Sequence, residues 1–287
     1  MFSSFPTPAQ ALPYGQFRFD YVGAGPLGEG GLGRVHRVRI LASNAPGKPV
    51  GSEWAVKRLN PQWDSHPGMR QRFEREISAL KRMSHPNIVT FEGENLPGAE
   101  RFYMMPLFAH TLRRHIAEGG LRGNWRAIAQ HGSILAKAMQ YAHDQGFIHR
   151  DFKPDNVLFN SDGPLVIADW GLGYFVHRSS VVLQHLTVGG MGTEYYCSAE
   201  QWATGKCDCR GDIYSLGMTL DEWLTGRQRA ITVGAGLQDA RTAPTGSLGA
   251  DRFNALLVRM TRFASRERPA SMRDVARELD VLAQLAW

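Results

Sequence analysis

Cysteine, lysine and long apolar runs are all scarce in this sequence. Three cysteines occur among 287 residues, at positions 197, 207 and 209. That number excludes a disulfide framework, and the spacing is not that of a four-ligand zinc site. We therefore expect free thiols in a reducing, cytoplasmic setting. No uncharged apolar run approaches the roughly 18 residues of a membrane span, and the N-terminus lacks the features of a secretory signal. We expect a soluble chain with no membrane partner and a loose leader over residues 1–16.

The charged residues are balanced in sign but skewed in type. Lys and Arg total 33 against 27 Asp and Glu, a net charge of +6, and only six of the basic residues are lysines. A basic balance can serve nucleic acid or an anionic membrane. The alternative is arginine spread over the surface with no such partner. Nucleic-acid binding would predict arginine clusters interleaved with aromatic residues. The arginines at positions 70, 72, 75 and 82 lie on one predicted helix, where they could equally face a phosphorylated segment or solvent. We therefore favour the alternative and expect no nucleic-acid partner. The six lysines then become the more informative positions.

The first 106 residues are predicted to be strand-rich with one helix. Phe73, Ile77 and Leu80 share one face at helical spacing, which predicts a helix over about residues 67–83. Pro86 disfavours helical geometry in the residue before it, so the helix ends there. Alternating apolar residues predict strands near residues 17–27, 34–40, 53–59, 88–91 and 101–105, and prolines and glycines predict a loop over 41–53.

The rest of the chain is predicted to be helix-rich. Apolar residues recur at offsets of three, four and seven over residues 125–143, which is typical of a long amphipathic helix. Further helices are expected over residues 212–224, 251–262 and 271–285. The chain therefore reads as an α+β protein. A small antiparallel β N-lobe with one helix (17–106) precedes a larger, mainly helical C-lobe (107–285).

A glycine-rich loop is the first candidate site. Gly28, Gly30, Gly33 and Val35 form the pattern G-x-G-x-x-G-x-V. Glycine lets the backbone approach phosphate oxygens closely. A dinucleotide-binding fold would need a helix after the third glycine, whereas the next segment alternates like a strand. A strand–loop–strand cover over phosphates therefore fits better, and a glycine-rich hairpin without a ligand is the alternative.

Lys57 follows Ala55 and Val56 in a predicted strand. A strand lysine usually faces solvent, but a compact ammonium can approach two phosphates in a narrow cleft where a guanidinium would not fit. Glu76, on the predicted helix, offers a carboxylate that could hold Lys57 in place. Because that helix carries other charges, a solvent-exposed Glu76 is the alternative.

Residues 149–156, His-Arg-Asp-Phe-Lys-Pro-Asp-Asn, are the most informative stretch. They precede an apolar strand at 157–159, and Asp169 lies eighteen residues after Asp151. Magnesium prefers hard oxygen ligands, usually one or two carboxylates plus substrate phosphates, and Asn156 and Asp169 would supply such oxygens. Asp151 would remain to orient an incoming hydroxyl and accept its proton. Taken singly, a loop Asp or Asn is also an ordinary turn former.

Together these motifs resemble the eukaryotic-type serine/threonine protein kinase family over residues of about 20 to 280. The glycine loop, the strand lysine, the helix glutamate and residues 149–156 occur in that family's order. Asp169-Trp170-Gly171 resembles its Asp-Phe-Gly motif with a larger aromatic residue. Further similarity lies in residues 192–200, which end in Ser-Ala-Glu where Ala-Pro-Glu is usual, in residues 212–217 and in Arg268-Pro269.

The resemblance implies a bilobal protein-kinase-like fold and transfer of the γ-phosphoryl group of ATP to Ser or Thr hydroxyls of protein substrates. Asp151 would position the hydroxyl, and Lys153 would stabilise charge on the transferring group. Asn156 and Asp169 would hold Mg²⁺. The residues implied to bind ATP are Leu27, Gly28, Gly30, Gly33, Val35, Ala55, Lys57, Glu76 and Leu158.

The resemblance also implies a means of regulation. Arg150 precedes Asp151, and in relatives with this arginine it often meets a phosphate that orders the activation segment. A simple loop hydrogen bond is the alternative for Arg150. The possible phosphate acceptors between Asp169 and Glu200 are Ser179, Ser180, Thr187, Thr193 and Tyr195. We favour Thr187, and Thr193 fits the threonine near the catalytic site of Ser/Thr kinases. We expect autophosphorylation in this segment.

Two other functions are compatible with the resemblance. A pseudokinase or scaffold would bind nucleotide or partners without efficient catalysis, but Lys57, Asp151, Asn156 and Asp169 are all present. A small-molecule kinase of the same fold would be favoured by the Asp169-Trp170 pair, but residues 149–156 and the segment up to Glu200 favour a protein substrate. The sequence makes no prediction of oligomeric state.

Overall fold

The computed structural model describes residues 16–95, 101–172, 174–175, 195–228 and 247–285. Contacts divide the chain into two units, which are considered one at a time. The first comprises Met1–Phe73 and Phe91–Leu107, and the second comprises Glu74–Thr90 and Phe108–Trp287. The predicted leader lies almost wholly outside the described residues. No helix in the described ranges is long and apolar enough to cross a membrane.

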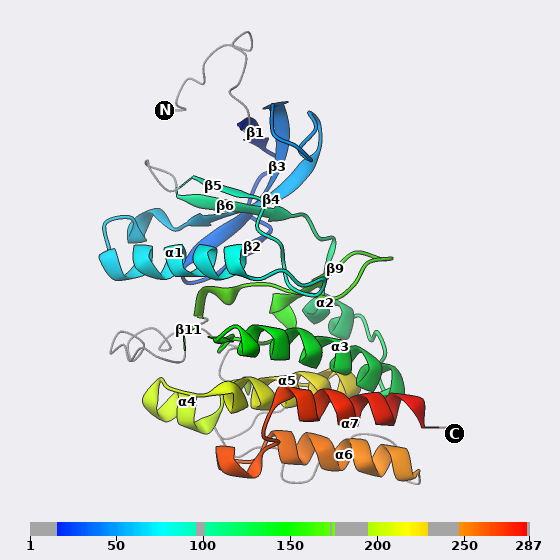
Figure 1. Ribbon diagram of the computed structural model, residues 1–287. Coiled ribbons are helices and arrows are strands. Elements are labelled where there is room, and N and C mark those ends of the chain that lie inside the picture. Colours follow the sequence, from blue (N-terminus) through cyan, green and yellow to red (C-terminus); the bar gives the residue numbers. More distant parts are fainter. Residues whose placement is uncertain (1–15, 96–100, 173, 176–194, 229–246, 286–287) are drawn as a thin grey trace. The chain divides into compact units, whose positions relative to one another are not determined.

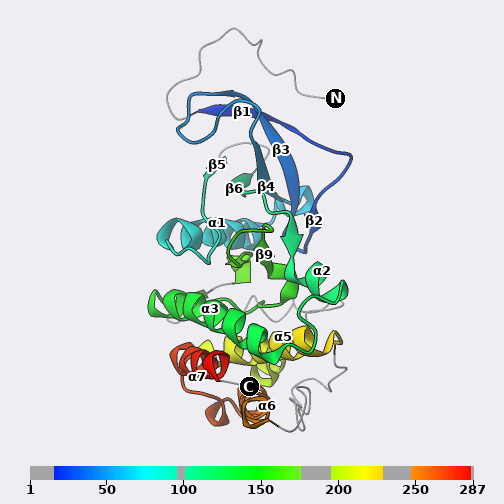
Figure 2. The same ribbon diagram turned by 90° about the vertical axis from the view of Figure 1, so that its right-hand side faces the viewer.

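The first unit is built on an antiparallel sheet, in which β1, β3, β4, β6 and β5 are neighbours in that order and β2 pairs with β3. Figure 2 shows β3 and β4 running side by side over most of their length. The core of this sheet consists of four fully buried side chains, Val38, Ile40, Val56 and Met104. The strands are β1 (Phe17–Tyr21), β2 (Gly28–Glu29), β3 (Gly33–Ser43), β4 (Glu53–Leu59), β5 (Gly93–Asn95) and β6 (Phe102–Pro106).

Three strand predictions need correction. The first strand ends at Tyr21, since Gly23 has φ +93°. Strand β3 continues to Ser43 because it pairs with β1 there, so tertiary pairing overrides the turn-like composition of the predicted loop. Residues 88–91 form no strand ladder. Ile88 and Val89 are apolar because they are buried, and Ile88 makes only an isolated bridge with Ile167.

Helix α1 (Pro67–Arg82) confirms the predicted amphipathic helix. Phe73, Ile77 and Leu80 are all buried. The Phe73 ring packs against Tyr103 of β6 within the first unit. From Glu74 onward the helix belongs to the second unit.

The second unit is mainly helical and confirms the long helices predicted from periodicity. Helix α3 packs along α7 and α5 (Figure 1). Every residue of α5 from Gly211 to Leu224 is buried, as expected for a helix that is covered on all sides. The short helices α2 and α4 were not predicted. The helices are α2 (Leu112–Ala117), α3 (Trp125–Asp144), α4 (Ala199–Thr204), α5 (Cys209–Thr225), α6 (Leu248–Met260) and α7 (Met272–Gln284).

Short strands of the second unit frame the loop of residues 149–156. This loop leaves β8 (Phe147–Ile148), passes through a 3₁₀ turn (Pro154–Asn156) and enters β9 (Val157–Phe159). Strand β9 pairs with β10 (Val166–Ile167) and β7 (His110–Thr111), and β8 pairs with β11 (Tyr174–Phe175). Strands in the first unit and helices in the second confirm the expected α+β class.

Candidate active site

The loop between β8 and β9 brings three predicted site residues together. The Lys153 ammonium lies 3.0 and 3.2 Å from the two carboxylate oxygens of Asp151. The Asn156 side chain donates from Nδ2 to the Asp151 carbonyl oxygen at 2.7 Å. That bond leaves Oδ1 as the acceptor of the Asn156 amide. The loop therefore presents an acid, a cation and an amide oxygen within one short segment.

Asp212, in the first turn of α5, anchors this loop through hydrogen bonds to its backbone. Its carboxylate has no exposed surface and accepts hydrogen bonds of 2.8 Å from the backbone N–H groups of His149 and Arg150 and from the His143 ring. Burial alone would raise its pKa, but the hydrogen bond from His143 and the backbone donors outweigh burial and hold the pKa of Asp212 below its usual range. A buried carboxylate thus fixes the loop just before Asp151.

Arg150 is held by its backbone as well. It is a non-glycine residue with φ +66°, a left-handed conformation that costs energy unless its surroundings enforce it. Its N–H bonds to Asp212, and its carbonyl oxygen accepts from Gln201 of α4 at 2.6 Å. These two bonds enforce the conformation that turns the chain toward Asp151.

Asp169 is placed next to Asn156 through the backbone. The Ala168 N–H donates to the Asn156 carbonyl at 2.8 Å, and the Ala168 carbonyl bonds to the buried His149 ring at 3.0 Å. Asp169 itself has φ +60°. This backbone hydrogen bond therefore joins one predicted metal ligand, Asn156, to the residue that precedes the other, Asp169.

Glu76 reaches the same segment from α1. It is almost fully buried, and a Cβ atom at Gly171 would lie 2.8 Å from its Oε2 and 3.3 Å from Oδ1 of Asp169. Any side chain at position 171 would therefore displace one of these carboxylates. The structure places Glu76 against the Asp169–Gly171 segment, which excludes the solvent-exposed alternative.

In the first unit, the glycine loop is the hairpin between β2 and β3. Gly30 donates to the Gly33 carbonyl at 2.9 Å, and the side chains of Asn60 and Trp63 bond to carbonyl oxygens at the tip at 3.2 and 2.7 Å. A Cβ at Gly33 would collide with the Arg58 carbonyl, whereas a Cβ at Gly28 would meet nothing within 4 Å. Packing within the described protein thus requires glycine at position 33, whereas open space lies beside position 28.

The sheet register places Lys57, Ala55 and Val35 on one face. Val35 pairs with Lys57 and Arg37 with Ala55, and paired residues of antiparallel strands point to the same side. The Lys57 side chain is nearly buried, with its ammonium 6.0 Å from the centre of the Tyr103 ring. Leu27, before the loop, is largely exposed and donates its N–H to the Val35 carbonyl. The predicted pairing of Lys57 with Glu76 and the predicted role of Leu158 involve residues of different units and stay predictions.

Comparison with known proteins agrees with this geometry. Residues 21–238 match the family described as protein kinase domain. The chain belongs to the protein kinase family. The kinase signature therefore covers both the hairpin with its strand lysine and the loop with its acid.

Individual relatives of this kinase domain are bacterial and plant proteins. It is 32% identical over 174 residues, 60% of this chain and 26% of the relative, to a probable serine/threonine-protein kinase of Clostridium acetobutylicum. It is 33% identical over 210 residues, 70% of this chain and 22% of the relative, to the receptor-like kinase TMK2 of Arabidopsis thaliana. The serine/threonine-protein kinase PknB of Mycobacterium leprae is 33% identical over 208 residues, 70% of this chain and 31% of the relative. The matches thus cover less than a third of these relatives' lengths.

The departures from the family pattern have clear structural settings. Trp170 is buried, its indole N–H donates to the Ile167 carbonyl at 3.3 Å, and its ring lies 4.6 Å from that of His149. Ala199, where the family usually has proline, is the first residue of α4, a position that favours proline without requiring it. Glu200 forms two hydrogen bonds with Arg268, at 2.7 and 2.9 Å.

Thr187 and Thr193 both lie outside the described residues, so the phosphate contact of Arg150 stays a prediction. Asp212 was identified from the sequence only as part of residues 212–217, and Gln201 was not identified. A buried polar partner sixty residues away leaves no local pattern, so no signal in the sequence alone singles these residues out.

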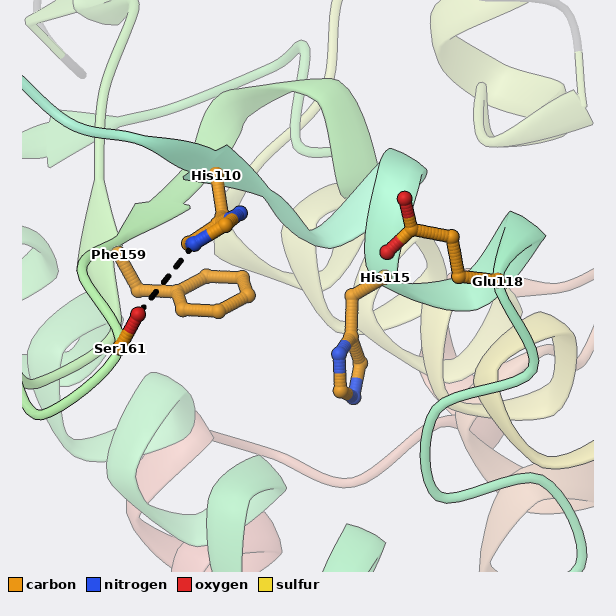
Figure 3. A pocket seen from close by; sticks show the side chains of 5 residues that line it. All are labelled: His110, His115, Glu118, Phe159 and Ser161. Atoms are coloured by element: carbon orange, nitrogen blue, oxygen red, sulfur yellow. Dashed lines mark hydrogen bonds between the residues drawn. The ribbon is translucent and has the colours of Figure 1, made fainter.

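A separate hollow of about 150 Å³ lies beside α2 in the second unit. In Figure 3 the His110 ring faces Ser161, whose hydroxyl is 3.5 Å from Nε2. Burial, with a smaller contribution from His131, lowers the pKa of His115. Across the ranges the structure describes, no three His, Cys, Asp or Glu side chains are grouped to hold a metal, so we assign none here. The hollow is lined by His110, His115, Glu118, Phe159 and Ser161 and includes none of the predicted catalytic residues.

Proposed function

We propose that this chain is an active serine/threonine protein kinase that transfers the γ-phosphoryl group of ATP to hydroxyls of protein substrates. The observation that carries the proposal is the hydrogen-bonded set of Asp151, Lys153 and Asn156 on a loop anchored by buried Asp212. An anchored loop keeps these groups oriented before substrate binds, and phosphoryl transfer depends chiefly on positioning and electrostatics.

The proposed reaction uses the loop residues as follows. The substrate hydroxyl oxygen forms a bond to the γ-phosphorus while the bond from that phosphorus to the bridging oxygen of ADP breaks, and ADP leaves with the electron pair. The Asp151 carboxylate orients the hydroxyl and accepts its proton. The Lys153 ammonium, 3.0 Å from Asp151 Oδ2, holds the carboxylate in place and offers positive charge to the transferring group.

The residues present fit a divalent cation. Asn156 keeps its Oδ1 for a ligand because Nδ2 is bonded to Asp151, and Asp169 adds a carboxylate from the adjoining backbone segment. Both are hard oxygen donors, which Mg²⁺ prefers. When bound, Mg²⁺ would neutralise negative charge on the phosphates. Gly28 and Lys57 would contact those phosphates from the hairpin and from β4.

Specificity for serine and threonine is supported by Lys153, two residues after Asp151, and by the similarity to bacterial proteins named as serine/threonine-protein kinases. The three cysteines are free thiols, which is compatible with the predicted cytoplasmic location. We propose protein substrates on the basis of Lys153 and of the similarity to these relatives. We propose neither a nucleic-acid partner nor a membrane partner.

The proposal is tested by incubating the protein with radiolabelled ATP, Mg²⁺ and casein. We expect label on the kinase itself and on casein, with phosphoserine or phosphothreonine after hydrolysis. Asp151→Asn should reduce transfer by about 10²–10⁴-fold, because the proton acceptor is lost. Asp162→Asn, an exposed aspartate in the turn after β9, is the matched control and should retain activity. Equal, background-level label in the wild type and Asp151→Asn would indicate a protein that binds without catalysis.

A further inference from the structure

Arg113, the second residue of α2, connects four segments of the second unit. Its guanidinium donates to Asp155 in the 3₁₀ turn at 3.0 and 3.1 Å and to the Tyr196 hydroxyl at 2.7 Å. It also forms an ion pair with Glu222 of α5. One side chain therefore ties α2 and α5 to the turn that follows Lys153 and to the chain just before α4.

The side of Arg113 that faces Tyr196 and Glu222 is closed to water, whereas the side that faces Asp155 is partly open, with the Arg113 side chain 29% and the Asp155 side chain 47% exposed. Tyr196 is buried, and its hydroxyl donates to Glu222 and accepts from Gln228 at 3.0 Å. The Glu222 side chain is 7% exposed. Burial, with Glu222 adding to it, raises the pKa of Tyr196, so this phenol stays a neutral donor. Because the Glu222 side chain is buried, its ion pair with Arg113 keeps its charge compensated. Removing Arg113 would leave an unpaired buried charge, which is costly.

The contact with Asp155 links this cluster to the predicted catalytic groups. Asp155 is the middle residue of the turn Pro154–Asn156, between Lys153 and Asn156. The turn is closed by hydrogen bonds from the Asn156 N–H to the Lys153 carbonyl and from the Val157 N–H to the Pro154 carbonyl. A three-residue turn closed in this way moves as one piece, so a restraint on Asp155 also restrains Lys153 and Asn156.

We propose that Arg113 is a positioning residue for the phosphoryl-transfer step. By holding Asp155, it sets the turn that carries Lys153 and Asn156. The proposal rests on the proposed kinase function. It gives Arg113 an effect on the turnover number, because a displacement of about 1 Å can cost about 10²-fold in rate.

The test compares Arg113→Met with Arg114→Met. Arg114 is the matched control, since it pairs with Glu118 on the exposed side of the same helix and both side chains are more than half exposed. We expect Arg113→Met to lower kcat by about 10–100-fold with KM for ATP changed less than threefold. Arg114→Met should match the wild type. Equal kcat values for the two variants would overturn the proposal.

A second pair of variants separates positioning from stability. Arg113→Met leaves Glu222 without its cation, so Arg113→Met/Glu222→Gln removes both charges and should restore part of the lost Tm. We expect kcat to stay low in this double variant, because the bond to Asp155 is still missing. In an Arg113→Met/Asp155→Asn cycle, the double variant should be no slower than the slower single variant. Recovery of kcat together with Tm, or additive losses in the cycle, would show a purely structural role.

Amide hydrogen exchange distinguishes failure of this proposal from failure of the kinase function. Absence of phosphoryl transfer by the wild type would contradict the kinase function. Exchange over residues 153–157 needs no turnover, and we expect it to be faster in Arg113→Met than in Arg114→Met, with exchange in α7 unchanged. Equal exchange over residues 153–157 in the two variants would overturn the link between Arg113 and the turn.

Discussion

Two glycines of the hairpin show how different constraints can select the same residue. Gly33 lies where β3 meets β4 so closely that a Cβ atom would collide with the Arg58 carbonyl. Gly28 has no protein atom near its missing side chain and does not have a positive φ. Packing therefore explains glycine at position 33, whereas packing does not explain it at position 28, where we propose a contact with phosphate.

Alanine substitutions at these two glycines should have different effects. Gly33→Ala should lower the free energy of unfolding by about 1–3 kcal/mol, because backbone must shift to admit the methyl group. Gly28→Ala should leave stability within about 0.5 kcal/mol but weaken ATP binding, because the methyl group occupies the proposed phosphate space. Urea unfolding and titration with ATP and Mg²⁺ would measure both. Wild-type ATP affinity in Gly28→Ala would contradict the assigned role of the hairpin.

At the scale of secondary-structure elements, the Glu200–Arg268 pair joins the start of α4 to the segment before α7. The Arg268 side chain has no exposed surface and also donates to the carbonyls of Arg262, Arg210 and Phe263. Burial opposes ionisation of Glu200, but the hydrogen bonds from Arg268 prevail and lower the pKa of Glu200 from its ordinary 4.5. Glu200 and Arg268 are therefore both charged in the folded state.

This pair should make stability depend on pH. A carboxyl whose pKa is lowered on folding stabilises the fold above its unfolded pKa, and the benefit is lost as pH falls through the folded value. Glu200→Gln should therefore cost about 2–3 kcal/mol at pH 7, with the difference from wild type shrinking below pH 4.5. Glu267→Gln, at an exposed position nearby, is the control for net charge. Thermal unfolding from pH 3 to 7 measures this, and a constant difference would contradict it.

At the scale of the whole molecule, the predicted nucleotide-binding residues come from both units. Lys57 lies on the sheet of the first unit, and Asp169 follows β10 in the second. A ligand that binds only the folded state stabilises it by about 2.7 kcal/mol at a hundred times its Kd. Binding therefore offers a measurement that does not depend on catalysis.

ATP with Mg²⁺ should raise the Tm of the wild-type protein by about 5 °C at saturating concentration. The shift should be lost in Lys57→Met and in Asp169→Asn, because each removes a charge proposed to bind the nucleotide or its metal. Lys206→Met, at an exposed position, should keep it. Differential scanning fluorimetry makes the comparison. A full shift in either site variant would place the nucleotide elsewhere.

Local pattern sufficed for much of the fold. Strand β4 was predicted to the residue, and the helices α1 and α3 follow from the spacing of their apolar side chains. Short apolar runs were less informative, because periodicity cannot distinguish a strand from a buried connection. Ile88 and Val89 are such a case, since they pack beside Ile167 without forming a ladder.

The sequence by itself determined which chemical groups this protein has and in what order they occur. It could do so because the motifs are short and local, and because the chemistry of glycine, lysine and aspartate depends on residue type. Only the tertiary structure decided what holds those groups in place. Asp212 bonds to residues 62 and 63 positions away, and Arg113 bonds to Glu222 across 109 positions. Such partners pair because an unpaired charge is costly once it is buried. Neither the spacing nor the composition of the sequence shows which distant residue will pair with a given buried charge.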